Sequence, residues 1–263
     1  MTDEYADLLE KAKKFLSFYD QYNSYDIYTD ELIYADPLVL TNTANEPLAK
    51  YSGENKIIKP AKLKVNDSDA VCDEEWMKAN SLDEMRTLIE DCKKCHLYKT
   101  RTKLVFGEGD PNAKLVVVGE APGESEDLQG VPFVGRAGQL LTKILEAINF
   151  KREEIFICNI LKSRPPANRN PVPAEIAGCV PYLHKQLELI KPSFILALGT
   201  FAAQSLLDTK EPLGKLRGKF HEYRGIKMMV TYHPAALLRN PNWKKPAWED
   251  VQLLRKEYDK VVK

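Results

Sequence analysis

Along most of the chain, short strand-like apolar runs alternate with segments in which apolar positions recur at the period of a helix. Short apolar runs rich in Val, Ile and Leu predict strands at about residues 114–119, 154–160, 193–198 and 226–231. Helical periodicity fills the intervals, at about residues 137–149, 173–190 and 200–207, and returns from about residue 247. Strands that alternate with helices predict an α/β fold, a three-layer sandwich with a central, mostly parallel four-stranded sheet.

A further helix is predicted ahead of the first strand. Ser81 and Glu84 have the spacing of a capping box, which satisfies free N–H groups at the start of a helix. The pattern predicts a helix that begins after Ser81 and runs to about Asp91. We place the start of the main domain here and assign residues 81–263 to it.

Residues 1–80 differ from this domain in composition. Residues 1–36 have a helical pattern rich in tyrosine, whereas residues 37–80 are polar, with three prolines and poor periodicity, as is typical of a linker. Residues 1–85 contain 9 lysines and 18 acidic residues, a net charge of −9, so residues 86–263 have a net charge of +9. We interpret residues 1–80 as an acidic helical extension with three open roles: docking of a protein partner, cover for the basic domain, or a solvated accessory helix.

The sequence has no apolar run of 18 residues, and its acidic N-terminus lacks the basic segment of a signal peptide. We therefore expect a cytoplasmic protein without a membrane span. We also expect it to be a monomer.

Two motifs at the ends of predicted strands carry the candidate chemistry. Glu120 lies in Gly119-Glu120-Ala121-Pro122-Gly123 after the first strand, and His233-Pro234 follows the last. Open α/β folds bind ligands at the carboxyl edge of their parallel strands, where both motifs should meet. Each motif alone is also an ordinary turn; together they predict a crevice that holds carboxylates and an imidazole.

Cysteines supply a second signal. Cys92 and Cys95 form a C-x2-C pair at the end of the first predicted helix. Structural disulfides are rare in the cytoplasm, so we interpret the pair as metal ligands. A thioredoxin-like redox pair is disfavoured because the motif precedes the first strand. Cys158, within a predicted strand, is interpreted as a small buried hydrophobe.

With these residues in hand, the segment from about residue 88 to 260 resembles the family-four uracil-DNA glycosylases, the iron–sulfur type. The matching segments, in order, are the C-x2-C pair, Phe106-Gly107-Glu108-Gly109, residues 118–123, Pro132-Phe133-Val134-Gly135, Asn159-Ile160, Arg164-Pro165-Pro166-x-Asn168-Arg169, Cys179, Ala197-Leu198-Gly199 and His233-Pro234. The resemblance implies an enzyme that flips uracil out of DNA and hydrolyses its N-glycosidic bond, leaving an abasic site. Residues 1–80 lie outside it.

The resemblance also implies roles in reading and releasing the base. Phe133 stacks on uracil, and the Asn159 carboxamide offers both a donor and an acceptor for O4 and N3–H. His233 donates to O2 as negative charge gathers there, and Glu120 orients water or stabilises the cationic sugar. Gly119, Ala121 and Glu126 complete the base site, with Glu126 as a weaker candidate for excluding the thymine methyl group.

Uracil-containing DNA is the expected partner, because basic side chains that neutralise phosphates drive binding that is independent of sequence. The positions implied to contact DNA are Arg164, Arg169, Leu238 and Arg239. Leu238 is the expected wedge that enters the base stack when uracil leaves it.

The implied cofactor is a 4Fe-4S cluster, and here the chain departs from the family. Cys92, Cys95 and Cys179 match three ligands, but the fourth position, just before Arg164, is Ser163. A serine oxygen is a harder ligand than a thiolate and suits iron less well. Cys158 lies about 16 Å away along an extended strand and should face the other side of the sheet. The cluster is then held by three cysteines, ligated by serine, labile or lost.

A second class of function stays open: a catalytically silent DNA-binding module, or DNA-polymerase accessory, with the same fold. The cross-linking relatives are disfavoured, because their inserted basic loop has no counterpart between Arg164 and Asn170.

Overall fold

A computed structural model describes residues 74–262 of the chain. The predictions for residues 1–73, which include Cys72, lie outside the described residues. None of the described helices is both long enough and apolar enough to cross a membrane.

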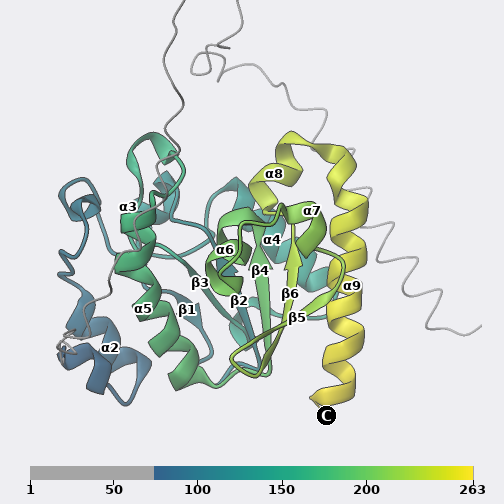
Figure 1. Cartoon of the computed structure of the whole chain (residues 1–263), viewed down its shortest axis with the longest axis horizontal. Helices are drawn as coiled ribbons and strands as arrows, with labels where there is room; N and C mark the ends of the chain where they lie inside the picture. Colours follow the sequence, from purple (N-terminus) through teal and green to yellow (C-terminus); the bar gives the residue numbers. More distant parts are fainter. Residues whose placement is uncertain (1–73, 263) are drawn as a thin grey trace, which may run out of the picture. The chain divides into compact units, whose positions relative to one another are not determined.

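A mixed sheet of six strands forms the centre of the described part (Figure 1). The strand order is β1-β3-β2-β4-β6-β5, and the four inner strands are parallel to one another. The strands are β1 (Glu108–Gly109), β2 (Leu115–Gly119), β3 (Phe156–Asn159), β4 (Phe194–Leu198), β5 (Phe220–Tyr223) and β6 (Ile226–Thr231). The inner strands are the four predicted ones, and the three-layer α/β class is confirmed.

The sheet has two more strands than the four we predicted. β1 and β5 pair antiparallel at its two edges, β1 with β3 and β5 with β6. β1 is only two residues long, and three of the four residues of β5 are partly or fully exposed, so neither has the apolar run that identifies a buried strand. Edge strands of this kind leave little periodic signal.

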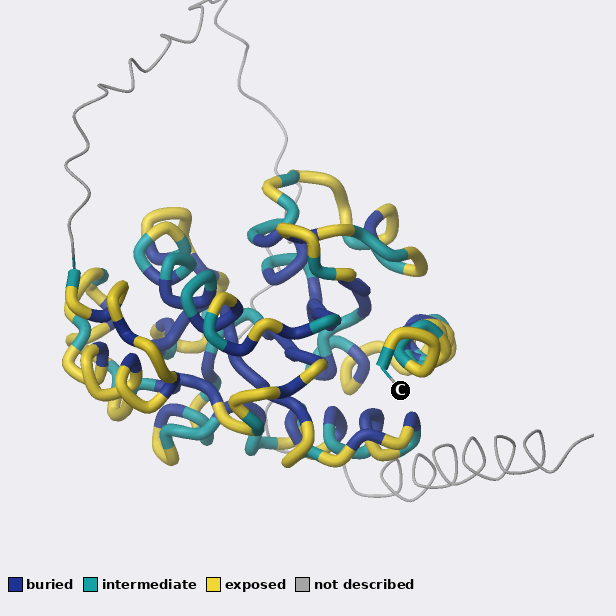
Figure 2. Tube along the Cα trace, turned by 90° about the horizontal axis from the view of Figure 1, so that it is seen from below, coloured by how far each residue is buried: buried dark blue, intermediate teal, exposed yellow. Residues whose placement is uncertain are grey.

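Helices cover both faces of the sheet. They are α2 (Leu82–Ile89), α3 (Glu124–Gln129), α4 (Arg136–Ala147), α5 (Pro173–Ile190), α6 (Gly199–Leu207), α7 (Leu213–Leu216), α8 (Pro234–Arg239) and α9 (Lys244–Val261). On one face, α2, α5 and α6 pack against alternate residues of the strands, such as Val116 and Val118. On the other face, α4, α8 and α9 pack against the residues between them, such as Leu115 and Val117. Figure 2 shows the buried strands enclosed by helices with exposed outer sides.

The folded domain, which we predicted to begin at Ser81, includes residues N-terminal of it. The Ser81 side chain accepts the Glu84 N–H at 3.1 Å, as the capping box predicts, while Glu84 takes the N–H of Asn80 instead of Ser81. A 3-10 helix, η1 (Glu75–Lys78), precedes this cap and buries Trp76 against Tyr182 of α5, with ring centroids 4.6 Å apart. Residues 74–80 therefore pack on the folded domain through Trp76 and Ala79.

Candidate active site

The pocket opens at the carboxyl edge of the parallel strands. β2 lies between β3 and β4 in the sheet. The chain therefore leaves β2 toward β3 on one side and later returns past β2 to β4 on the other. Open α/β sheets form a ligand-binding crevice where the strand order reverses in this way. The pocket has a volume of about 320 Å³. Its lining residues are Glu120, Ala121, Pro122, Gly123, Glu126, Phe133, Ala137, Asn159, Pro165, Asn168, His233, Ala235 and Arg239.

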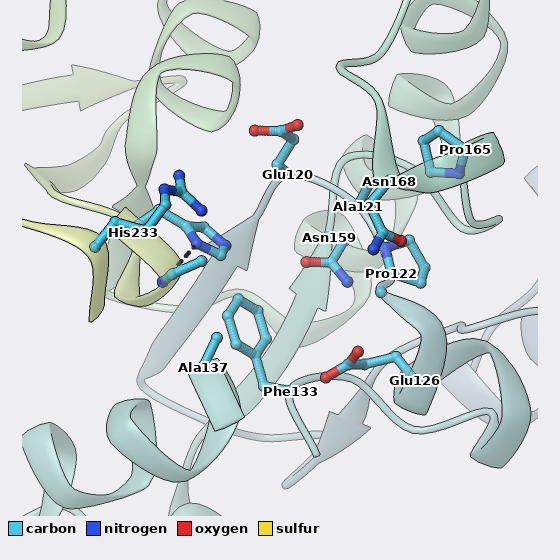
Figure 3. A pocket seen from close by; sticks show the side chains of 13 residues that line it. Glu120, Ala121, Pro122, Glu126, Phe133, Ala137, Asn159, Pro165, Asn168 and His233 are labelled. Atoms are coloured by element: carbon cyan, nitrogen blue, oxygen red, sulfur yellow. Dashed lines mark hydrogen bonds between the residues drawn. The ribbon is translucent and has the colours of Figure 1, made fainter. Parts of the chain in front are cut away.

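Segments far apart in the sequence meet here. Glu120, Glu126 and Phe133 come from the connection after β2, Asn159 ends β3, and His233 follows β6. Figure 3 shows Phe133 and Glu120 on opposite sides of one space, with His233 and Asn159 facing it from either side. Among the residues predicted for the base site, only Gly119 does not line the pocket itself.

Gly119 supports the pocket from behind. A Cβ atom on Gly119 would lie 2.3 Å from Oδ1 of Asn159 and 2.5 Å from Cζ of Phe133, which is closer than atoms can approach. The missing side chain therefore allows the amide and the aromatic ring to reach their positions. Asn159 is 1% exposed, and its Oδ1 is one of two buried side-chain N or O atoms that lack a hydrogen-bond partner among the described residues. Because Asn159 lines the pocket, this buried acceptor is available to a donor group of a bound ligand.

Phe133 is held in an unusual backbone conformation. Its φ of 54° is left-handed, which is uncommon for a bulky residue and costs free energy unless the surroundings impose it. The Glu126 Oε1 atom accepts the N–H groups of Val134 and Gly135, both at 2.9 Å. The Arg152 guanidinium, from outside every motif we singled out, donates to the carbonyl of Pro132. The loop is thus fixed on both sides of Phe133, and Glu126 acts on pocket shape through the backbone.

The His233 ring lies 5.5 Å from the Phe133 ring, centroid to centroid. Its Nδ1 atom accepts the backbone N–H of Ala235 at 3.2 Å. A neutral imidazole that accepts at Nδ1 carries its proton on Nε2, so Nε2–H is available as a donor. Burial lowers the pKa of His233 to about 4, with a further contribution from Arg239. The ring is therefore a neutral donor at physiological pH.

Glu120 begins the connection after β2 at the mouth of the pocket. Burial raises the pKa of its carboxyl to about 7, and the nearby Arg239 partly offsets this rise. A carboxyl with a pKa near neutrality is a common feature of sites that act on substrates. Ala121, beside it, also lines the pocket and contributes only a methyl group.

The residues predicted to contact DNA have different surroundings. Leu238 and Arg239 are exposed on α8, and Leu238 is 38% exposed. Arg164 is half-buried and donates to Oδ1 of Asn168 at 2.8 Å. The Arg169 guanidinium is paired with the buried Glu175, at 2.6 and 3.0 Å, at the start of α5. Arg169 therefore has a clear structural partner, and its contact with DNA stays a prediction.

The proposed cluster ligands share one neighbourhood beside α5. Cys179 donates to Cys95, which lowers the pKa of the Cys95 thiol to about 6, and the Tyr182 hydroxyl donates to Sγ of Cys92 at 3.1 Å. The Arg101 guanidinium links Ser163, at the fourth ligand position, to the C-x2-C pair. It donates to Oγ of Ser163 at 3.2 Å and to the carbonyl of Cys92 at 2.8 Å.

The three cysteines suit three of the four ligand positions of an iron–sulfur cluster. No three metal-binding side chains in residues 74–262 are placed to hold a single ion. A 4Fe-4S cluster requires a different ligand spacing from a single ion. Each thiolate binds a different iron, so the ligands lie further apart. The three thiols, linked to one another and to the Ser163 hydroxyl through these contacts, therefore suit such a cluster at three positions, with a hard oxygen ligand at the fourth.

The position of Cys158 corrects part of our interpretation. It is fully buried in the same core as Cys179, on the face of the sheet that α2 and α5 cover. The prediction that it faces the other side was wrong, because β3 ends at Asn159 and the alternation of a strand does not continue to Ser163. Its burial agrees with its interpretation as a small hydrophobe.

Several lining residues were missed in the sequence, among them Pro165, Asn168, Ala137 and Ala235. Pro165 and Asn168 lie within a motif that we recognised but read only for its arginines. Ala137 and Ala235 carry no chemical signal, since they contribute shape and backbone atoms.

The fold and pocket define an α/β protein with a ligand site at the carboxyl edge of its parallel strands, and comparison with known proteins identifies its family. The model of the uracil DNA glycosylase superfamily matches residues 106–252. The type-4 uracil-DNA glycosylase of Archaeoglobus fulgidus is 43% identical over 191 residues, which cover 70% of this chain and 90% of that protein. Its counterpart in Saccharolobus solfataricus is 43% identical over 185 residues (67% and 86%), and that of Thermotoga maritima is 46% identical over 154 residues (58% and 80%). The chain belongs to the uracil DNA glycosylase superfamily and, within it, to the type-4 enzymes.

Proposed function

We propose that this protein excises uracil from DNA, hydrolysing the N-glycosidic bond and leaving an abasic site for base-excision repair. The observation that carries the proposal is the buried Oδ1 of Asn159, which has no hydrogen-bond partner in the described part of the chain and faces the space beside Phe133. Uracil supplies the missing donor through N3–H, and the Asn159 amide group donates to O4 in return. Cytosine presents an acceptor at N3 and a donor at C4, so it mismatches both contacts.

Stacking and shape support the same substrate. A base that has left the duplex loses its neighbours, and Phe133 replaces one of them with an aromatic face. Because Glu126 and Arg152 fix the loop, the ring does not have to be ordered when the base arrives. Glu126 borders the pocket on the Phe133 side, where it narrows the space for a methyl group such as that of thymine.

The chemistry follows from where charge develops. When the N-glycosidic bond breaks, its electron pair stays with uracil and negative charge gathers on O2, while the sugar becomes oxocarbenium-like. The Nε2–H group of the neutral His233 donates to O2, and a single donor of this kind contributes about 10²-fold or more in rate. The Glu120 carboxylate stabilises the cationic sugar or orients the water that adds to C1′.

We propose that Arg164, Arg169 and Arg239 bind the DNA phosphates. Leu238 is the proposed wedge that fills the space left by the flipped base. Support comes from the exposure of Leu238 and Arg239 on α8, directly after His233.

The test uses a uracil-containing oligonucleotide with and without hot alkali. Strand cleavage at the uracil position after alkali, and none in an oligonucleotide with thymine at that position, is the expected result. Retention of the oligonucleotide in a gel without any cleavage would favour the silent DNA-binding module instead.

We further propose that Cys92, Cys95 and Cys179 hold three irons of a 4Fe-4S cluster, as type-4 enzymes generally bind one. When bound, the cluster has a structural role, since glycosidic hydrolysis transfers no electrons. It ties the C-x2-C segment and α5 to the residues around Ser163.

Iron and sulfide per protein, with the broad visible absorbance of such clusters, test the cluster. Ser163→Cys should raise iron content and retention of the cluster in air, and leave single-turnover cleavage nearly unchanged. A colourless, iron-free and fully active protein prepared without oxygen would show that the site has lost its metal.

A further inference from the structure

We propose that Trp243 is a stacking platform for an unflipped base of the DNA strand next to the uracil. The proposal deepens the proposed function, since it concerns the same DNA. It starts from the short connection between α8 and α9, η5 (Pro241–Trp243), which lies at the end of the sheet where α3 and α8 also lie (Figure 1).

Trp243 presents part of a large apolar surface to solvent. Its exposed fraction is 39%, so part of the indole is accessible to a ligand. Leu238, in the preceding helix α8, is 38% exposed. Two large apolar side chains, five positions apart, are thus partly exposed, and the first of them lies five positions after His233, which we propose stabilises the leaving group.

The exposed indole is held in a fixed orientation. It stacks on Tyr232 with ring centroids 4.8 Å apart and an angle of 13° between the planes. Tyr232 is itself in contact with the Arg217 guanidinium, 5.3 Å from the ring centroid. Arg217 is anchored by Asp250 through two hydrogen bonds of 3.0 and 2.8 Å, and Thr231 donates to the same carboxylate.

This support has two consequences. One face of the indole is covered by Tyr232, so a ligand must use the other face, as a stacked base does. In addition, an ordered ring loses little conformational entropy when a ligand binds to it. Because Tyr232 directly precedes His233, the stack is connected by backbone to the reaction site.

The charge around Trp243 favours a nucleic acid over a protein as the occupant. Residues 233–248 contain three basic side chains, Arg239, Lys244 and Lys245, and no acidic one. A strand of DNA offers both a negative backbone and flat bases, and stacking on an aromatic side chain tolerates any base. A strand whose uridine has been flipped has an interrupted stack, so a neighbouring base is available to Trp243.

Binding of a uracil-free single-stranded oligonucleotide tests the platform without relying on cleavage. Trp243→Leu keeps an apolar side chain but cannot stack, and should weaken binding about tenfold, whereas Trp243→Phe should lose much less. Tyr98→Leu, which removes an aromatic side chain that is 36% exposed on η2 (His96–Lys99), is the matched control and should bind like the wild type.

Tryptophan fluorescence gives an independent readout. The chain has three tryptophans, and stacking of a base should quench the emission of Trp243. DNA should therefore quench the wild type clearly more than Trp243→Phe.

Equal affinity of wild type and Trp243→Leu for the oligonucleotide, together with equal quenching in Trp243→Phe, would overturn the platform and leave a protein partner as the occupant of this surface. That result is distinct from failure of the proposed function, which would appear as absent uracil cleavage by the wild type whatever the binding data show.

Discussion

In the proposed mechanism His233 and Glu120 act on opposite sides of the N-glycosidic bond, and their environments shift their pKa values in opposite directions. Burial lowers the pKa of the His233 imidazole to about 4 and raises that of the Glu120 carboxyl to about 7. The same desolvation disfavours the charged form of each group, which is why the two shifts have opposite signs. Between these two values the imidazole is neutral and the carboxyl is largely protonated.

His233→Ala should lower single-turnover excision by about 10²-fold or more, with little change in affinity for uracil-containing DNA. The hydrogen bond strengthens only as charge reaches O2, so its loss affects the transition state more than the ground state. Rapid-quench kinetics at saturating enzyme measure the chemical step, and a binding assay with an uncleavable uridine analogue is the control. An unchanged rate would remove His233 from the mechanism.

The pH dependence of excision should report Glu120. Its raised pKa means that the carboxylate becomes dominant only above about pH 7, so the rate should rise with pH through this value and level off above it. His233 stays neutral throughout this window, because its pKa of about 4 lies below it. Glu120→Gln should be slower and should lose this rise. A wild-type profile that is flat from about pH 6 to about pH 8 would contradict the assignment.

The Phe133 loop shows how elements outside the recognised motifs shape the pocket. Arg152, in the 3-10 helix η3 (Arg152–Glu154), crosses to the carbonyl of Pro132, and α4 approaches so closely that a Cβ atom on Gly138 would lie 1.9 Å from the carbonyl oxygen of Phe133. These contacts support the left-handed backbone of Phe133, a conformation that persists only where the surroundings impose it.

Arg152→Ala should loosen this loop and raise the KM for uracil-containing DNA about tenfold, with a smaller change in kcat, because stacking on Phe133 contributes to both ground state and transition state. Arg255→Ala is a matched control, since Arg255 also donates to a backbone carbonyl, that of Asn149, at 3.1 Å, and does not line the pocket. Steady-state kinetics of the three proteins decide the matter. Equal KM values for wild type and Arg152→Ala would show that Glu126 alone holds the loop.

The inner strands and long helices were predictable because burial imposes a strong period on their sequences. The four inner strands were placed within two residues, and α5 (Pro173–Ile190) at its observed bounds. The edge strands β1 and β5 were not predictable, since their formation depends on backbone pairing with β3 and β6. Arg152 was missed for a related reason: its partner is a carbonyl group, which every residue has, so no pattern of side chains reveals the contact.

The described part of the molecule begins with residues that the sequence suggested were linker. Trp76 is 6% exposed, and Lys94 lies over its ring at 4.7 Å and over that of Tyr182 at 4.9 Å, while its ammonium group pairs with Glu74 at 2.6 Å. These contacts place residues 74–80 over the C-x2-C segment, since the hydroxyl of Tyr182 bonds to Cys92. They join the N-terminal side of the domain to the cysteines.

A chain that starts at residue 74 should keep its activity and bind DNA as well as or better than the full chain, because it lacks much of the acidic charge. A chain that starts at Ser81 should be less stable, and Trp76→Ala in the full chain should lower the free energy of unfolding by about 3 kcal/mol. Thermal or urea unfolding measures this, and Leu253→Ala, at a site 37% exposed on α9, is the control for loss of surface apolar area. Equal stability of the two truncated chains would show that η1 contributes little.

The order of the strands divides the pocket between two parts of the chain. Phe133 and Asn159, which we propose hold the base, belong to the segments around β2 and β3, whereas His233 follows β6, beyond β4. Evolution can therefore alter one part and keep the other. A descendant that lost only His233 would be a reader of uracil, able to mark deaminated cytosine without cutting. One that lost only Asn159 would keep a leaving-group donor without a fixed substrate, which is a starting point for enzymes that remove other damaged bases.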